Sequence, residues 1–166
     1  MQKLIAAIIG LLLSAVINAQ ADPASTPPYK RFPSVPPFKL LKTDSVSVFT
    51  KADLKKNRPV LVILFSPECD HCKHETEEII RRIDDFKKIQ IVMATMMPLN
   101  TARQFYEEYE LARFENITVG KDMDNLLPTY YAINNLPFLA FYDKKGKLID
   151  VFEGSLPVEK VLGKFE

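Results

Sequence analysis

The chain has 166 residues, of which 22 are basic and 21 are acidic, so its formal net charge is +1. Charged residues make up 26% and hydrophobic residues 47%, the balance of a soluble globular protein rather than a disordered or fibrous one. The near-neutral charge argues against nucleic-acid binding, which needs a basic excess to neutralise phosphates. Two cysteines are too few for a disulfide-dense scaffold or a four-cysteine metal site.

The first 21 residues have the pattern of a secretory signal peptide. Lys3 precedes an apolar run of 14 residues, 4–17, and Ala19 and Ala21 supply small residues for cleavage. The run is shorter than the roughly 20 residues that a membrane-spanning helix needs, which makes a retained membrane anchor the less favoured alternative. We therefore expect residues 1–21 to be removed and the protein to be exported.

Residues 22–37 contain six of the twelve prolines of the chain. Proline has no amide donor and a fixed φ angle, which disfavours both helix interiors and central strands. This stretch is therefore expected to be an extended, proline-rich lead, followed by one folded domain over residues 38–166.

The folded part alternates between strand and helix patterns. Two short apolar stretches, 38–41 and 46–49, predict a hairpin, and Thr50 can cap a short helix over 51–56. Residues 60–65 are all apolar, which is typical of a strand buried on both faces of a sheet. Further helices are expected over about 69–88, 101–111 and 158–165, and further strands over 89–94, 138–142 and 148–152. This order predicts an α/β sandwich with a mixed sheet.

Both cysteines lie in a C-x-x-C segment, Cys69-Asp70-His71-Cys72, between the predicted buried strand and a helix. At the start of that helix, free amides and the positive end of the helix dipole favour the thiolate of Cys69. The thiolate is the attacking species in disulfide exchange, and Cys72 lies close enough to release a substrate from a mixed disulfide. The segment therefore predicts a redox-active pair.

Three other uses of the two cysteines are weaker. Haem attachment needs His directly after the second cysteine, where this chain has Lys73. A metal site could recruit His71 and His74, although Cys72 and His74 would lie about 200° apart around a helix. Inert structural thiols are the third alternative, but an exposed turn in an oxidising compartment suits them poorly.

Residues 38–165 resemble the thioredoxin-like proteins, and most closely the secreted bacterial TlpA/ResA-like thiol–disulfide oxidoreductases. The resemblance is carried by the predicted hairpin, the buried strand, C-D-H-C, and the segment Asn135-Leu-Pro-Phe-Leu-Ala-Phe-Tyr-Asp143, whose Pro137 follows Cys72 by 65 residues. It implies a three-layer sandwich with helices on both faces of the sheet and an N-terminal β-hairpin extension. It also implies that Pro137 is cis and lies against the cysteines, and that Leu136 bonds the substrate backbone.

The sequence departs from the family at two places. Glu68 stands where many relatives carry Trp, and residues 60–65 lack the buried Asp of thioredoxin itself. Proton transfer to and from Cys72 therefore needs another group, and Glu75, three residues further along the same helix face, is the candidate. The alternative for Glu75 is an ordinary solvated helix carboxylate.

The resulting hypothesis is a periplasmic thiol–disulfide oxidoreductase in which Cys69 attacks and Cys72 resolves. Its expected partners are protein thiol or disulfide substrates and a redox partner protein. It needs no cofactor and no metal, touches a membrane only if the N-terminal segment is retained, and is expected to be monomeric. One alternative is a copper-handling protein on the same fold; another is a binding module with a vestigial redox pair.

The local features disagree about redox direction. His71 stabilises the Cys69 thiolate and so favours an oxidant, as in DsbA and protein disulfide isomerase. Asp70 and Glu75 oppose this, because nearby carboxylates disfavour a second negative charge. Together with the resemblance, they favour a reductase with a potential of roughly −270 to −120 mV.

Overall fold

The computed structural model describes residues 26–166. The predicted signal peptide, residues 1–21, lies outside the described residues, as does the start of the proline-rich lead. Within residues 26–166, no helix has the length and apolar character needed to cross a membrane.

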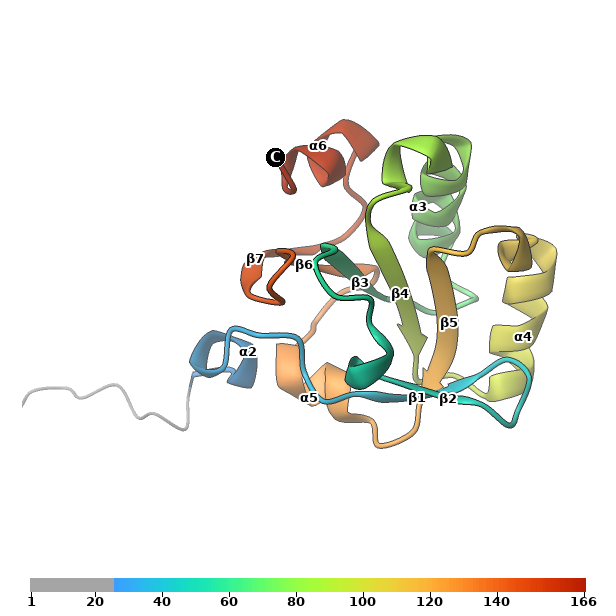
Figure 1. The fold of residues 1–166 in the computed structure, drawn as a ribbon. Helices are drawn as coiled ribbons and strands as arrows, with labels where there is room; N and C mark the ends of the chain where they lie inside the picture. The colour runs from blue at the N-terminus through green and yellow to red at the C-terminus, as the bar shows by residue number, and fades with distance from the viewer. Residues whose placement is uncertain (1–25) are drawn as a thin grey trace, which may run out of the picture.

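Seven strands form one mixed sheet in the order β2-β1-β5-β4-β3-β6-β7 (Figure 1). Strands β3, β4 and β5 are parallel, and β6 and β7 extend the sheet in antiparallel fashion. At the other edge β1 and β2 form the expected hairpin, which joins β5 through β1. The strands are β1 (Lys39–Lys42), β2 (Val48–Thr50), β3 (Val60–Leu64), β4 (Gln90–Thr95), β5 (Ile117–Asp122), β6 (Phe138–Tyr142) and β7 (Leu148–Glu153).

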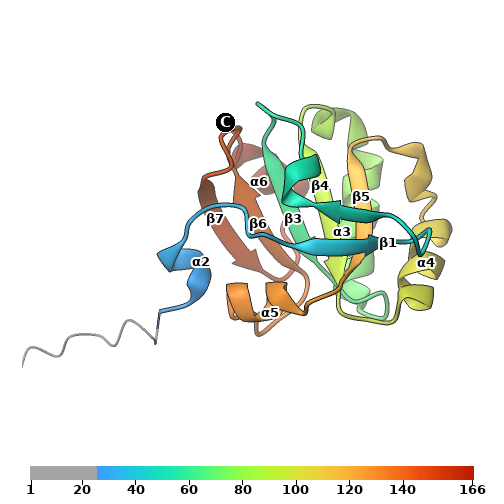
Figure 2. The ribbon, with the colours of Figure 1, turned by 60° about the horizontal axis from the view of Figure 1, so that its bottom comes forward.

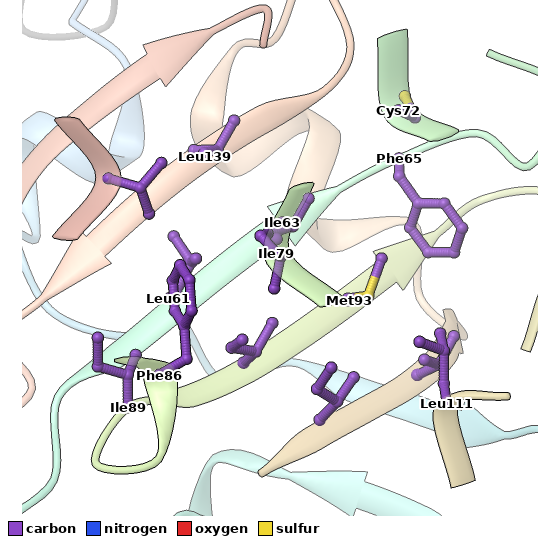
Figure 3. Close-up of a cluster of buried hydrophobic side chains, with 14 of the residues drawn as sticks. Leu61, Ile63, Phe65, Cys72, Ile79, Phe86, Ile89, Met93, Leu111 and Leu139 are labelled. Atoms are coloured by element: carbon purple, nitrogen blue, oxygen red, sulfur yellow. The ribbon is translucent and has the colours of Figure 1, made fainter. Parts of the chain in front are cut away.

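Helices cover both faces of the sheet, because successive side chains of each buried strand enter opposite cores. One core, whose side chains Figure 3 shows, contains Leu61 and Ile63 of β3. It lies under α3, α4 and α6. The other contains Val60 and Val62 and lies under α2 and α5, which Figure 2 shows next to each other. The helices are α2 (Pro28–Arg31), α3 (Asp70–Arg81), α4 (Leu99–Glu108), α5 (Leu126–Tyr131) and α6 (Val158–Gly163). The predicted three-layer sandwich is confirmed.

The apolar run over residues 60–65 is explained by β3, which is an interior strand of the sheet with helices over both of its faces. It pairs with β4 on one side and β6 on the other, and all five of its residues are buried. The helix that follows the cysteines ends at Arg81, earlier than predicted, and a 3-10 turn over Ile83–Phe86 places the buried Phe86 in the core. The short helix after Thr50 is a 3-10 turn over Lys51–Asp53, capped by Thr50 as expected.

The proline-rich lead is not wholly extended, because its middle forms the short helix α2. Pro28 occupies the first helical position, where its fixed φ angle and missing amide cost nothing. The Tyr130 hydroxyl shares its single proton between the carbonyl oxygens of Phe32 and Ser34, the latter at 2.9 Å. The lead is therefore packed against the domain from α2 onward.

The largest error of the sequence prediction is the omission of β5 and α5. Strand β5 reads Ile117-Thr-Val-Gly-Lys-Asp122, which lacks the apolar run of a central strand. Gly120 is needed there because a Cβ atom would lie 2.9 Å from both the Leu40 Cβ and the Leu41 carbonyl oxygen. Helix α5 begins beyond the strand, where the buried Asp122 carboxylate accepts the amide of Leu127 at 2.8 Å. Neither the contact of Gly120 with β1 nor the hydrogen bond from Leu127 to Asp122 produces a hydrophobic pattern from which a strand or helix could be predicted.

Gly120→Ala is expected to destabilise the protein by about 1–3 kcal/mol, because β1 and β5 must separate to admit the methyl group. Gly163→Ala is the matched control, since a Cβ atom there meets nothing within 4 Å. The free energy of unfolding of Gly163→Ala, measured by urea denaturation, should stay within about 0.5 kcal/mol of the wild-type value. Equal stability of the two variants would contradict the close approach of β1 and β5.

Candidate active site

The cysteine pair lies where β3 ends and α3 begins. Cys69 is the N-cap residue of α3, and its Sγ accepts the backbone N–H of Cys72 at 3.3 Å. Serine, threonine and aspartate oxygens commonly occupy this position, where they satisfy amides that the first helical turn leaves free. The free amides of the first turn stabilise a sulfur atom at this position as a hydrogen-bond acceptor, and they stabilise a thiolate more than a thiol.

Cys72 has the opposite environment, one turn inside the helix. Its side chain is 1% exposed and lies in the core near Phe65 (Figure 3). Burial, followed by the hydrogen bond to the Cys69 sulfur, raises the pKa of Cys72 to about 12. The nearby Glu75 carboxylate adds to this shift. Both cysteines are free thiols in this structure, and Cys72 is the one that needs help to lose its proton.

Glu75 is buried at 2% exposure, so the solvated-carboxylate alternative is wrong. Its Oε2 accepts the backbone N–H of Leu156 at 2.8 Å, whereas Oε1 has no hydrogen-bond partner within residues 26–166. Burial raises the pKa of Glu75 to about 7, although the Leu156 amide works in the opposite direction. A carboxyl group with this pKa can take up and release a proton near neutral pH.

The loop before β6 brings Leu136 and Pro137 to the cysteines. The Leu136–Pro137 peptide bond is cis. The Cys69 thiol lies 3.8 Å from the carbonyl oxygen of Leu136, within reach of a weak S–H donor bond. The structure thus brings together four of the residues singled out from the sequence, namely Cys69, Cys72, Leu136 and Pro137, with Glu75 behind them.

Asp70 and His71 lie on the exposed first turn of α3. The Asp70 carboxylate is 3.8 Å from Lys73 Nζ, at a surface position where such an ion pair contributes little. The carbonyl oxygen of His71 accepts the hydroxyl of Ser155 at 2.9 Å. Both residues lie between the two cysteines in the chain, and their tuning role stays a prediction.

The family profile of the thioredoxin-like domain matches residues 49–166. The chain belongs to the thioredoxin-like domain family. With two free cysteines at the start of α3, this thioredoxin-like protein is a thiol–disulfide oxidoreductase. A comparison with curated protein sequences gave no match.

Several solved structures share the fold at low sequence identity. A secreted disulfide oxidoreductase of Mycobacterium tuberculosis, homologous to Escherichia coli DsbE, superposes with a TM-score of 0.63 at 18% identity, covering 76% of this chain and 92% of that chain. StoA from Bacillus subtilis gives 0.58 at 19% identity, over 81% and 100% of the two chains. The peroxidoxin BcpB of M. tuberculosis gives 0.65 at 16% identity, over 79% and 92%. These likenesses show the fold alone.

Sequence reasoning missed the segment after β7 that closes this thioredoxin-like site. Ser155 bonds His71, and the Leu156 amide bonds Glu75 across 81 positions of the chain. Both contacts use groups that any sequence can offer, a hydroxyl and a backbone amide, so no motif could have indicated them. Within the described part of the chain, no group of three or more His, Cys, Asp or Glu side chains is placed to hold a metal ion.

In the reduced protein, iodoacetamide is expected to alkylate Cys69 at least about ten times faster than Cys72. Cys69 is partly exposed at the N-cap, whereas Cys72 is buried and its raised pKa keeps it a thiol. Peptide mass spectrometry after short exposure at pH 7 measures both rates in one sample. Faster labelling of Cys72 would reverse the roles of the two residues.

Proposed function

We propose that the protein is an extracytoplasmic, TlpA-like thiol–disulfide oxidoreductase that reduces disulfides of protein substrates. One observation carries the proposal. The Cys69 sulfur is held at the N-cap of α3 by the Cys72 amide, 3.8 Å from the Leu136 carbonyl, with the buried Cys72 behind it. An accessible nucleophile and a sheltered resolving thiol are what two-step disulfide exchange needs.

In the first step, the Cys69 thiolate attacks one sulfur of a substrate disulfide. The substrate S–S bond breaks, its other sulfur leaves as a thiolate that takes a proton from solvent, and a mixed disulfide with Cys69 remains. The extended substrate segment would lie along Leu136 and Pro137, where the backbone of Leu136 can hydrogen-bond to it. Asp70 and His71 would adjust the stability of the Cys69 thiolate from the rim of the site.

In the second step, the Cys72 thiol passes its proton to the Glu75 carboxylate and attacks the Cys69 sulfur. The bond between Cys69 and the substrate breaks, the second substrate sulfur leaves as a thiolate that takes a proton from solvent, and a Cys69–Cys72 disulfide forms. Two electrons have then moved from the protein dithiol to the substrate. Since the two cysteines carry both electrons, the cycle needs no organic cofactor, and a redox partner protein returns the electrons.

The extracytoplasmic location is supported by the signal-peptide pattern of residues 1–21 and by the likeness to a secreted disulfide oxidoreductase. In Gram-negative bacteria this location is the periplasm. Outside the cytoplasm, disulfides form and persist, so a substrate for a reductase is available there.

Turnover of a polypeptide disulfide tests the proposal. The chain without residues 1–21, supplied with dithiothreitol, is expected to accelerate insulin reduction, and the Cys69→Ser variant is expected not to. The reduced protein is also titrated with copper(I). Tight, stoichiometric copper retention without insulin reduction would overturn the proposal in favour of metal handling.

A further inference from the structure

The last residue of β7 and the three residues that follow it contact both halves of the site. Strand β7 ends at Glu153, which pairs with Phe138 at the start of β6. Residues 153–156, here named the clasp segment, then cross from the loop that carries Leu136 and Pro137 to helix α3. Each of its four residues makes a hydrogen bond to a different part of the site.

The first half of the clasp segment holds the loop before β6. The Glu153 carboxylate accepts the backbone N–H of Asn135 at 3.1 Å and its side-chain amide at 3.0 Å. The Asn134 amide lies 3.4 Å from the other carboxylate oxygen. Gly154 donates its N–H to the carbonyl oxygen of Pro137 at 2.7 Å. The Glu153 carboxylate therefore bonds Asn134 and Asn135, directly before Leu136, and Gly154 bonds Pro137, directly after it.

The second half of the clasp segment holds helix α3. The Ser155 hydroxyl donates to the carbonyl oxygen of His71 at 2.9 Å, and the Leu156 amide donates to the Glu75 carboxylate at 2.8 Å. His71 and Glu75 lie on either side of Cys72 in the chain. The loop before β6 and helix α3 are thus both hydrogen-bonded to the clasp segment.

We infer that Glu153 is a positioning residue for polypeptide substrates, which it serves by fixing Asn134 and Asn135 so that the Leu136 backbone stays in register with Cys69; this rests on the proposed function. Asn134 and Asn135 are exposed, so without the carboxylate their amides would bond water and the loop would gain freedom. Hydrogen bonds to a charged acceptor are the stronger kind, which suits a restraint on a surface loop. A substrate that binds along Leu136 needs this restraint, whereas a small disulfide that only collides with Cys69 does not.

The test is a comparison of kinetic constants for Glu153→Ala. We expect the KM for insulin reduction to rise about tenfold while kcat changes by less than about twofold. The rate constant for a small aromatic disulfide, which has no backbone to bind, should fall far less than kcat/KM for insulin. Glu153→Gln keeps one acceptor oxygen and should give an intermediate KM.

Asp150→Ala is the matched control, because Asp150 is also in β7 and its carboxylate, within residues 26–166, accepts hydrogen bonds only from Lys164 Nζ, at 2.6 Å, and from the adjacent Val151 amide. Its KM for insulin should equal that of the wild type. An equal rise in KM for both variants, or equal losses with insulin and the small disulfide, would overturn the inference. If the wild-type protein fails to react with the small disulfide at all, the proposed function itself fails, which separates the two results.

Discussion

Replacing Cys69 with serine is expected to lower the rate of insulin reduction by at least about three orders of magnitude, the scale found when a catalytic nucleophile is removed. A hydroxyl at the N-cap can accept the Cys72 amide as the sulfur does, so α3 should keep its cap and the fold should survive. Cys72 cannot take over the attack, because its side chain is 1% exposed and a substrate disulfide does not reach it. Steady-state turnover and circular dichroism of the same sample measure the two effects.

Cys72→Ser is the informative partner of this variant. Cys69 can still attack, but nothing resolves the intermediate, so a mixed disulfide between Cys69 and the substrate should accumulate. Mass spectrometry under non-reducing conditions detects the adduct and locates it. An adduct on Cys72 of the Cys69→Ser variant, with none on Cys69 of the Cys72→Ser variant, would reverse the assigned roles.

The second large effect is expected for Glu75→Gln. If Glu75 accepts the Cys72 proton, resolution should speed up in the wild type as the pH passes about 7, where the carboxyl group ionises. In the variant, Cys72 should resolve the mixed disulfide about a hundredfold more slowly above pH 7, and the increase in rate near pH 7 should disappear. General bases typically accelerate a reaction step by about 10²–10⁴-fold. Stopped-flow measurement of mixed-disulfide decay gives the profile. An unchanged profile would leave Glu75 with a structural role only.

Glu75→Gln should also alter how stability depends on pH. Burial raises the folded pKa from 4.5 to about 7, so the folded protein binds this proton more tightly than the unfolded chain. The favourable contribution is complete below pH 4.5 and is lost as the pH rises to about 7. At about 1.4 kcal/mol per pKa unit, the wild type should lose at most about 3 kcal/mol relative to the variant over this interval. Urea unfolding of both proteins at pH 4.5 and 8 measures the difference.

The sequence predicts those parts of the fold in which neighbouring residues share one environment. Residues 60–65 are uniformly apolar because β3 lies in the middle of the sheet, and the C-x-x-C pair marks the strand–helix junction behind it. Strand β5 was not predicted because Gly120 interrupts its apolar pattern, and this glycine is required by the close approach of β1, a segment about eighty positions away.

The site shows the same division. Cys69, Cys72 and Pro137 belong to recognisable motifs, and the spacing from Cys72 placed Glu75 on the correct helix face. The burial of Glu75, whose carboxylate bonds the Leu156 amide of the clasp segment, could not be predicted from the helix sequence. The same helix carries the exposed Glu77 and the partly exposed Glu78. The Glu153 contacts span 18 and 19 positions and use the backbone amides of Asn134 and Asn135, which no sequence pattern distinguishes from other amides.

The charges around the pair bear on redox direction. His71 and Asp70 are both exposed, so solvent would weaken the opposing effects predicted for them. Glu75 is buried close to Cys72 and raises its pKa, which works against a doubly charged reduced form. The burial of Glu75 beside Cys72 is thus the feature that supports the proposed reductase direction.

Equilibration of the protein with glutathione redox buffers, followed by alkylation and mass spectrometry, tests the central claim most directly. We expect a single two-electron transition in which Cys69 and Cys72 form a disulfide together. Its potential should lie between the thioredoxin value of about −270 mV and the DsbA value of about −120 mV, and closer to the former. A potential near −120 mV would contradict the reductase direction. The absence of any reversible Cys69–Cys72 disulfide would contradict the redox function altogether.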